Sequence, residues 1–176
     1  ADRWRGFEDI ADSRHLANRV EREGVDALVD AVQDSFPRLS QRYYQMKARW
    51  RGLDVMEHWD RNAPLPVEDE KLICWSDAKA TVLDAYSGFA PEMAEIANDF
   101  FEKRWIDAPV RKGKSPGAFA HPTVPSVHPY VLLNYLGKPR DVMTLAHELG
   151  HGVHQVLAGS QGPLMAQTPL TLAETA

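Results

Sequence analysis

The sequence has a single cysteine, no excess of basic residues and no long apolar run. Cys74 alone cannot form an internal disulfide or a cysteine-rich zinc or iron–sulfur site, so we expect it to be a small core residue beside Trp75. The 20 Lys and Arg residues are outnumbered by 25 Asp and Glu residues, and the net charge is −5. Nucleic acid is therefore not an expected partner.

No run approaches the roughly 18 apolar residues that a membrane span requires, and the N-terminus lacks the pattern of a signal peptide. Together with the single cysteine, this favours a cytoplasmic protein without a membrane partner. The 176 residues are 44% hydrophobic and 26% charged, which is typical of a globular domain. Since the chain runs from Ala1 to Ala176 and stops near the start of a predicted helix, we expect an excerpt of a longer protein, truncated at its C-terminus.

Residues 1–106 have a helical pattern. Apolar side chains recur every three or four positions over residues 25–50, which predicts a long amphipathic helix or helix pair. Pro37 interrupts this pattern, so a kink or a fresh start is expected near Ser35. Three further helices are predicted: residues 14–20, closed by Glu23-Gly24; residues 76–86, capped by Ser76; and residues 91–105, begun by Pro91.

Residues 107–140 change character to a basic loop followed by two short strands and a turn. The loop contains Gly113-Lys114-Ser115, but Ala108 stands where a phosphate-binding loop requires glycine. Pro129 lacks the N–H that a central strand uses, which predicts that the second strand lies at a sheet edge. Such an edge can pair with an extended peptide, although a hairpin that only packs on helices is the alternative.

Residues 141–159 form one predicted helix, with Asp141 as N-cap and Gly159 just past its end. At 100° per residue, its apolar positions fall within about 80° of one another, and His147 and His151 lie within about 40° of each other on the opposite side. The apolar positions are Val142, Leu145, Leu149, Val153 and Val156. The helix therefore has a core face and a histidine face.

The histidine face carries His147-Glu148-Leu149-Gly150-His151, an H-E-x-x-H arrangement. Two imidazoles about 6 Å apart along the axis can converge on one metal ion, and zinc suits imidazole and carboxylate ligands. Glu148 lies at the flank of the two histidines, where its carboxylate can take a proton from a zinc-bound water.

A third ligand must come from elsewhere. His154 lies about 10.5 Å along the axis from His147, too far for one ion, so we expect a pocket residue or a solvated histidine. Glu174 is the candidate, presented from the second turn of a helix that starts at Thr168-Pro169, and a solvated surface glutamate is the alternative.

Two glycines lie inside the predicted helix at 141–159. Gly150 and Gly152 each cost about 1 kcal/mol relative to alanine there. We therefore expect a close neighbour at this helix, such as the backbone of the hairpin.

The stretch from Asn134 through the histidine helix to His154 resembles the oligoendopeptidase F branch of the thimet oligopeptidase-like zinc metallopeptidases. Residues 104–107, the loop at 112–119 and residues 172–176 fit the same family. The resemblance implies a mainly α fold, a helical catalytic domain with a small β-hairpin or sheet beside the zinc-binding helix. It also implies that His147, His151 and Glu174 bind Zn²⁺, that Glu148 activates the water, and that short peptides are the substrates.

The chain is accordingly expected to be one partial catalytic domain. Its parts are a helical region at 1–106, a loop and hairpin at 107–140, and the zinc helix, connector and start of the third-ligand helix at 141–176. The residues that stabilise the transition state are expected beyond Ala176. Two alternatives stay open: an inactive helical or metal-binding fragment, and a zinc hydrolase that acts on a non-peptide amide or ester.

Overall fold

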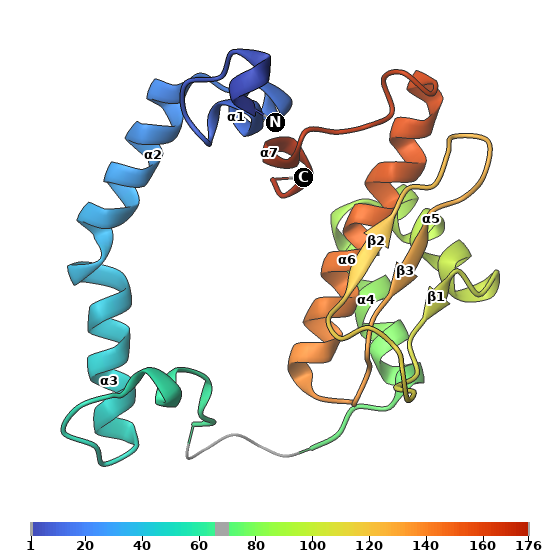
Figure 1. Ribbon diagram of the computed structural model, residues 1–176. Coiled ribbons are helices and arrows are strands. Elements are labelled where there is room, and N and C mark those ends of the chain that lie inside the picture. Colours follow the sequence, from blue (N-terminus) through green and yellow to red (C-terminus); the bar gives the residue numbers. More distant parts are fainter. Residues whose placement is uncertain (1, 66–70, 176) are drawn as a thin grey trace. The chain divides into compact units, whose positions relative to one another are not determined.

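The computed structural model describes residues 2–65 and 71–175, and the chain divides into two compact units, residues 1–69 and 70–176 (Figure 1). Each unit has its own secondary structure. The expectation that the whole chain is one partial catalytic domain stays a prediction. Among the described residues, none of the helices is long and apolar enough to traverse a lipid bilayer.

The first unit is helical. It contains α1 (Asp12–Asn18), α2 (Arg22–Ser35) and α3 (Arg42–Trp50), with short 3₁₀ helices at Asp2–Arg5 and His58–Asn62. A π-helical turn at Pro37–Gln41 separates α2 from α3, so the expected break near Ser35 is confirmed. The closure of the preceding helix by Glu23-Gly24 is wrong. That helix ends at Asn18 because Arg19 takes a left-handed backbone, with φ of 56°, and Gly24 lies inside α2.

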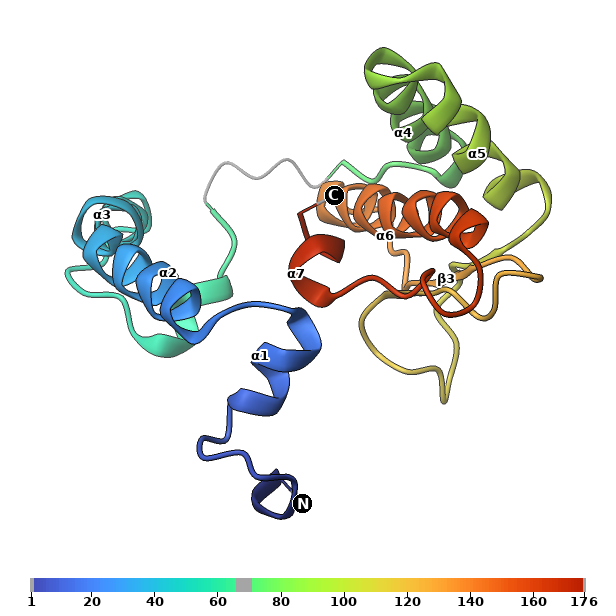
Figure 2. The ribbon, with the colours of Figure 1, turned by 90° about the horizontal axis from the view of Figure 1, so that it is seen from above.

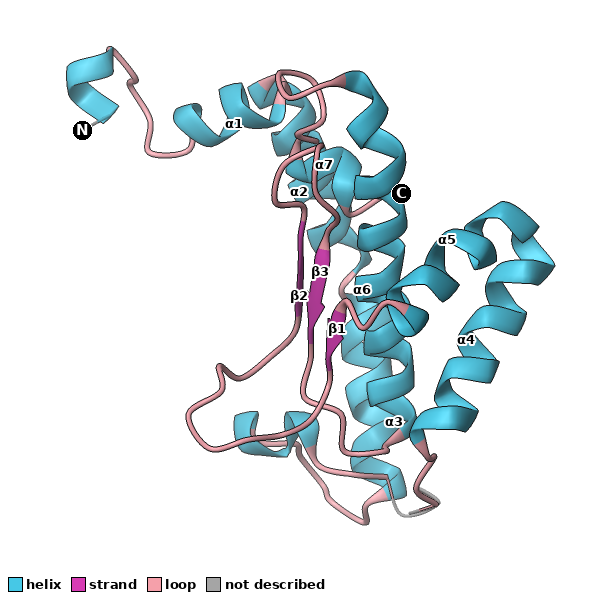
Figure 3. Cartoon of the chain, turned by 90° about the vertical axis from the view of Figure 1, so that its right-hand side faces the viewer, coloured by secondary structure: helices cyan, strands magenta, loops and turns pink. Residues whose placement is uncertain are grey.

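The second unit contains α4 (Trp75–Phe89), α5 (Pro91–Glu102), α6 (Pro139–Ala158) and α7 (Leu170–Ala173). Figures 2 and 3 show α6 between the sheet and the α4–α5 pair. Two predicted boundaries are wrong: Cys74, not Ser76, is the N-cap of α4, and α5 stops at Glu102 because Arg104 has φ of 58°. Cys74 is exposed, so the prediction that it belongs to the core is also wrong.

The sheet has three short strands, β1 (Ile106–Asp107), β2 (Phe119–His121) and β3 (Tyr130–Leu132). β2 and β3 pair antiparallel, which confirms the predicted hairpin, and β1 pairs parallel with β3. The order is β1-β3-β2 (Figure 3), so the prediction that the strand after Pro129 lies at the edge is wrong. Pro129 precedes the strand, and the Val131 N–H is free to donate to the Trp105 carbonyl at 2.9 Å. β1 and β2 are therefore the two edge strands of the sheet, with β3 between them.

The core of this unit lies where the sheet, α6 and the α4–α5 pair meet. Its fully buried side chains include Val82, Phe100, Val131, Leu133, Leu145 and Leu149. The prediction of a mainly helical fold with a small sheet beside the histidine helix is confirmed.

The start of α6 differs from the expected cap. The helix begins at Pro139, with Lys138 as N-cap, so the assignment of Asp141 as N-cap is wrong. Asp141 lies in the first turn, and its carboxylate accepts hydrogen bonds from the N–H of Leu136 at 2.9 Å and of Lys138 at 3.0 Å. Asp141 therefore stabilises the helix start from inside the first turn, where its charge also suits the helix dipole.

The close neighbour expected at the glycines of α6 comes from helices. At Gly152, an added Cβ would lie 2.7 Å from the ring of Phe100, which is fully buried. At Gly150, it would lie 3.5 Å from the Tyr86 hydroxyl. The neighbours are thus side chains of α5 and α4, and the suggested hairpin backbone is not among them.

Gly152→Ala should lower the free energy of unfolding by about 1–2 kcal/mol, because the strain of an overpacked core exceeds the gain in helix propensity. Gly150→Ala is the matched control. It should be neutral or raise that free energy by up to about 1 kcal/mol, since 3.5 Å is an ordinary contact. Urea denaturation of both variants tests this, and equal effects would contradict the packing described at Gly152.

Candidate metal centre

Two imidazoles lie on one face of α6. Its opposite face buries Val142, Leu145, Leu149 and Val153, and this packing fixes the rotation of the helix. The Nε2 atoms of His147 and His151 are 3.1 Å apart, and the side chains are 55% and 17% exposed. The predicted histidine face is therefore present and accessible.

Glu174 approaches the same two nitrogens. Its Oε2 lies 3.7 Å from Nε2 of His147, and its Oε1 lies 3.6 Å from Nε2 of His151. Glu174 directly follows α7, a single turn that begins after Pro169, so its expected place in a second helical turn is wrong. Even so, residues 159–169, which connect α6 to α7, bring Glu174 back to the histidine face of α6.

The three groups fit a metal ion by size and by chemistry. Each of His147, His151 and Glu174 offers one donor atom, and these atoms lie within 4.8 Å of one another. Ligands at about 2.1 Å in a tetrahedral arrangement are separated by about 3.4 Å. The two imidazole nitrogens, 3.1 Å apart, are close to that value, and each lies 3.6–3.7 Å from a different oxygen of the Glu174 carboxylate. Two imidazoles and a carboxylate also form a donor set that divalent transition metals accept.

Glu148 is buried beside this group, with 8% of its surface exposed. Burial is the largest influence on its carboxyl and raises its pKa. The charges of His147 and His151 and a hydrogen bond from the backbone of Ala120 oppose that rise, whereas Glu174 adds to it. Because Ala120 belongs to β2, the edge strand lies next to this carboxylate.

Two cavities flank the histidines along α6. One, of about 900 Å³, includes His147 and Glu148 and extends toward the start of the helix, past Thr144, Met143 and Arg140. The other, of about 800 Å³, lies toward the end of the helix, at Gln155, Val156 and Gly159. The pair of cavities leaves space on both sides of the candidate metal centre.

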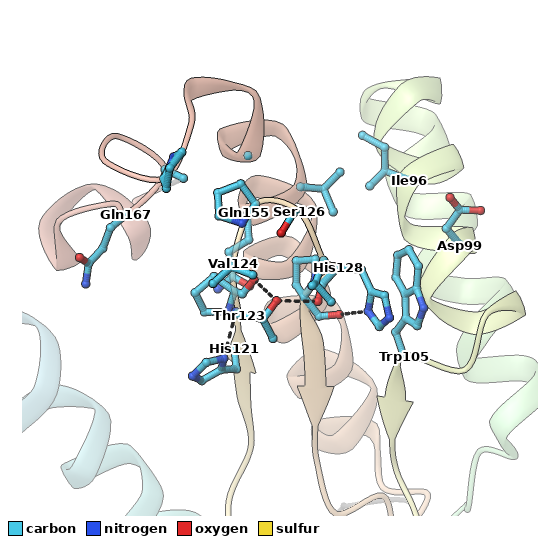
Figure 4. Close-up of a pocket in the computed structure, with 18 residues that line it drawn as sticks. Ile96, Asp99, Trp105, His121, Thr123, Val124, Ser126, His128, Gln155 and Gln167 are labelled. Atoms are coloured by element: carbon cyan, nitrogen blue, oxygen red, sulfur yellow. Dashed lines mark hydrogen bonds between the residues drawn. The ribbon is translucent and has the colours of Figure 1, made fainter.

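The loop that joins β2 to β3 lines the second cavity with residues that include Thr123, Val124 and Ser126 (Figure 4). In this loop the His128 ring stacks on Trp105, with ring centroids 4.0 Å apart and planes inclined by 6°. His121, at the end of β2, accepts a hydrogen bond from the Thr123 N–H at 3.0 Å. His154 is partly buried and lines neither cavity, so the expectation that it is a pocket residue is wrong. Its neighbour Gln155 lines the second cavity instead.

The wall of the first cavity depends on Lys114, whose role the sequence does not reveal. Its side chain is only 6% exposed, and its Nζ donates to the carbonyls of Asp107, Pro109 and Leu133 at 2.7–3.0 Å. Burial tends to raise the pKa of Asp107, but hydrogen bonds and charge from Lys114 and Arg111 outweigh it and lower that pKa. Lys114 thereby ties the loop at 108–118 to Leu133, the residue that directly follows the central strand β3.

Comparison with known proteins adds independent information. The model of the family described as Peptidase family M3 matches residues 3–176. The oligopeptidase PepF of Bacillus subtilis is 29% identical over 146 residues, which cover 83% of this chain and 22% of that protein. An oligoendopeptidase F homolog of Lactococcus lactis subsp. lactis is 29% identical over 170 residues, which cover 96% of this chain and 28% of the homolog.

The fold is also found among solved structures. A crystal structure from Chlamydophila abortus matches with a TM-score of 0.74 and 27% identity, over 96% of this chain and 28% of that one. The chain thus spans about a quarter of the length of the relatives that it matches. These matches confirm the resemblance to oligoendopeptidase F.

Lys114→Met should lower the free energy of unfolding by about 1–3 kcal/mol, because partly buried carbonyls lose their donor. Lys112→Met, an exposed lysine of the same loop, is the control and should change it by less than about 0.5 kcal/mol. Part of the difference in unfolding free energy between the two variants should vanish at low pH. Since the folded-state pKa of Asp107 is lowered, its ion pair stabilises above the ordinary pKa of about 3.9 and is lost as pH falls through the lowered value. Equal effects of the two variants at pH 7 would contradict this role.

Proposed function

The chain belongs to peptidase family M3, and we propose that it carries the metal centre of a zinc-dependent endopeptidase that hydrolyses short oligopeptides. The observation that carries the proposal is the convergence of His147, His151 and Glu174 within 4.8 Å, beside the buried carboxylate of Glu148. Since the chain is about a quarter as long as its relatives, the activity is proposed for the whole protein.

His147, His151 and Glu174 would hold the zinc ion. Two imidazoles and one carboxylate are a common protein ligand set for catalytic zinc, and three protein ligands leave one position open. When bound, zinc lowers the pKa of water and polarises the carbonyl oxygen of the scissile peptide. The 3.1 Å separation of the two imidazole nitrogens supports this assignment without any rearrangement of α6.

Glu148 is proposed as the general base. Its carboxylate accepts a proton from the attacking water, whose oxygen forms the new bond to the carbonyl carbon. The same proton then passes from Glu148 to the leaving nitrogen as the C–N bond breaks. Burial raises the pKa of this carboxyl toward the working pH, which suits a group that first accepts and then donates a proton.

The edge of β2 suits an extended peptide. The outer side of this strand is not paired within the sheet, and backbone groups on such an edge bind a peptide without selecting its side chains. Ala120 places this edge beside Glu148. The cavities on both sides of the candidate metal centre leave room for residues before and after the scissile bond, which favours an endopeptidase.

The wild-type protein should bind one zinc ion per chain. His147→Ala should weaken zinc binding by more than about a hundredfold, because loss of a direct ligand exceeds the effect of altering its supporting groups. His154→Ala is the matched control on the same helix and should bind zinc normally. Elemental analysis and chelator competition on untagged protein measure both. Equal binding by the two variants would contradict the assigned ligands.

Glu148→Gln should lower kcat/KM for a short fluorogenic peptide by about 10²–10⁴-fold, while zinc remains bound, because the amide cannot accept the proton of the water. The assay uses the full-length protein. Zinc binding with hydrolysis that survives this substitution would refute the role of Glu148. Zinc binding without any peptide hydrolysis by the wild type would leave a metal-binding module or a hydrolase of other amides or esters.

A further inference from the structure

The side chain of Tyr86, in α4, contacts the backbone of α6, the helix that carries His147 and His151. The hydroxyl of Tyr86 donates a hydrogen bond to the carbonyl of Ala146, the residue before His147. The two residues are 60 positions apart in the sequence. Both residues pack against the buried core, so this hydrogen bond joins α4 and α6, two helices that the core already holds in place.

The acceptor belongs to the turn of α6 that separates the two imidazoles. In an α-helix, the carbonyl of Ala146 also accepts the N–H of Gly150, four residues later. Ala146 directly precedes His147, and Gly150 directly precedes His151. The Tyr86 hydroxyl therefore contacts the hydrogen-bonded turn whose geometry sets the spacing of the two ligands.

Gly150 leaves room for this contact. A Cβ at that position would lie 3.5 Å from the Tyr86 hydroxyl, so any longer side chain would compete with the phenol for space. Burial raises the pKa of Tyr86 to about 12, which keeps the hydroxyl protonated and able to donate over the working range of an enzyme. An alanine would still fit at this position, so what the Tyr86 contact requires is a small residue and not glycine itself.

We propose that Tyr86 is a positioning residue of the metal centre, which holds the Ala146–Gly150 turn so that His147 and His151 present their nitrogens at the spacing that zinc requires. The inference rests on the proposed function, because it concerns the affinity and geometry of the same zinc site. It predicts an effect that simple core packing would not produce. A packing role stabilises the zinc-free and zinc-bound protein equally, whereas a positioning role favours the zinc-bound protein.

Tyr86→Phe keeps the ring and removes only the donor. Changing groups that orient zinc ligands typically costs 10–100-fold in affinity, and Tyr86 acts one step further away through the backbone. We therefore expect zinc binding to weaken by about threefold to tenfold, with a changed visible spectrum for the cobalt-substituted protein. Chelator competition and cobalt absorption, both on the full-length protein, provide the readouts.

Tyr135→Phe is the matched control. The Tyr135 hydroxyl also donates to a backbone carbonyl, that of Ile73 at 2.8 Å, but neither residue belongs to α6. It should lower the unfolding temperature to a similar extent without changing zinc affinity by more than about twofold. Gly150→Val tests the same contact from the α6 side. Its branched methyl groups reach past the Cβ position toward the hydroxyl, and it should also weaken zinc binding.

The outcomes separate the two proposals. If the wild type binds zinc and Tyr86→Phe binds it equally well with an unchanged cobalt spectrum, Tyr86 has only a packing role and the inference is overturned. If Tyr135→Phe weakens zinc binding as much as Tyr86→Phe, the effect is a general loss of stability and the inference is again overturned. If the wild type does not bind zinc, the proposed function itself fails, and the inference with it.

Discussion

The second unit depends on the burial of one face of α6. Leu145 and Leu149 are fully buried on that face, and the period of the helix then directs His147 and His151 to the opposite side. Any rotation of α6 that moved the imidazoles would expose these leucines, at about 1.5–3 kcal/mol for each side chain. The apolar core therefore determines the direction of the histidines, and no contact between the histidines themselves is needed for that.

The α4–α5 pair refines this arrangement. Phe100 lies against Gly152 so closely that no other residue type fits without a shift, and Tyr86 contacts the turn that precedes Gly150. Gly152 lowers the intrinsic stability of the helix, but it lets the ring of Phe100 approach the helix backbone, whereas a Cβ at Gly150 would be in ordinary contact with the Tyr86 hydroxyl. Rotation is thus set by the core face, whereas translation along the axis is limited by the contact at Gly152.

The parts of the site that were predictable from the sequence are those that lie within one helix. The spacing of His147, Glu148 and His151 fixes their relative positions once the helix is assumed, because one turn of an α-helix has a single geometry. Contacts between distant segments could not be predicted in this way. Lys114 meets the carbonyl of Leu133, and Tyr86 meets that of Ala146, and neither contact follows from any local period.

The sheet shows the same limit in another form. β1 has two residues, too few to produce an alternating pattern, and its pairing with β3 places at the centre a strand that was expected at the edge. The rule about proline holds, but it applies to residues inside the hydrogen-bonded ladder. Pro129 lies one residue before β3, a margin finer than sequence patterns resolve.

Glu174 differs in kind from the two histidines. The histidines belong to a helix of 20 residues with a buried face, whereas Glu174 follows a helix of four residues that buries none of them. A single helical turn has little stability of its own. In the proposed zinc site, therefore, the histidines are positioned before the metal binds, and much of the free energy of the third ligand bond is linked to the placement of α7. The free energy needed to order α7 is then subtracted from the free energy of zinc binding. Zinc affinity therefore depends on how firmly the chain holds α7 as well as on the strength of the three bonds between zinc and its ligands.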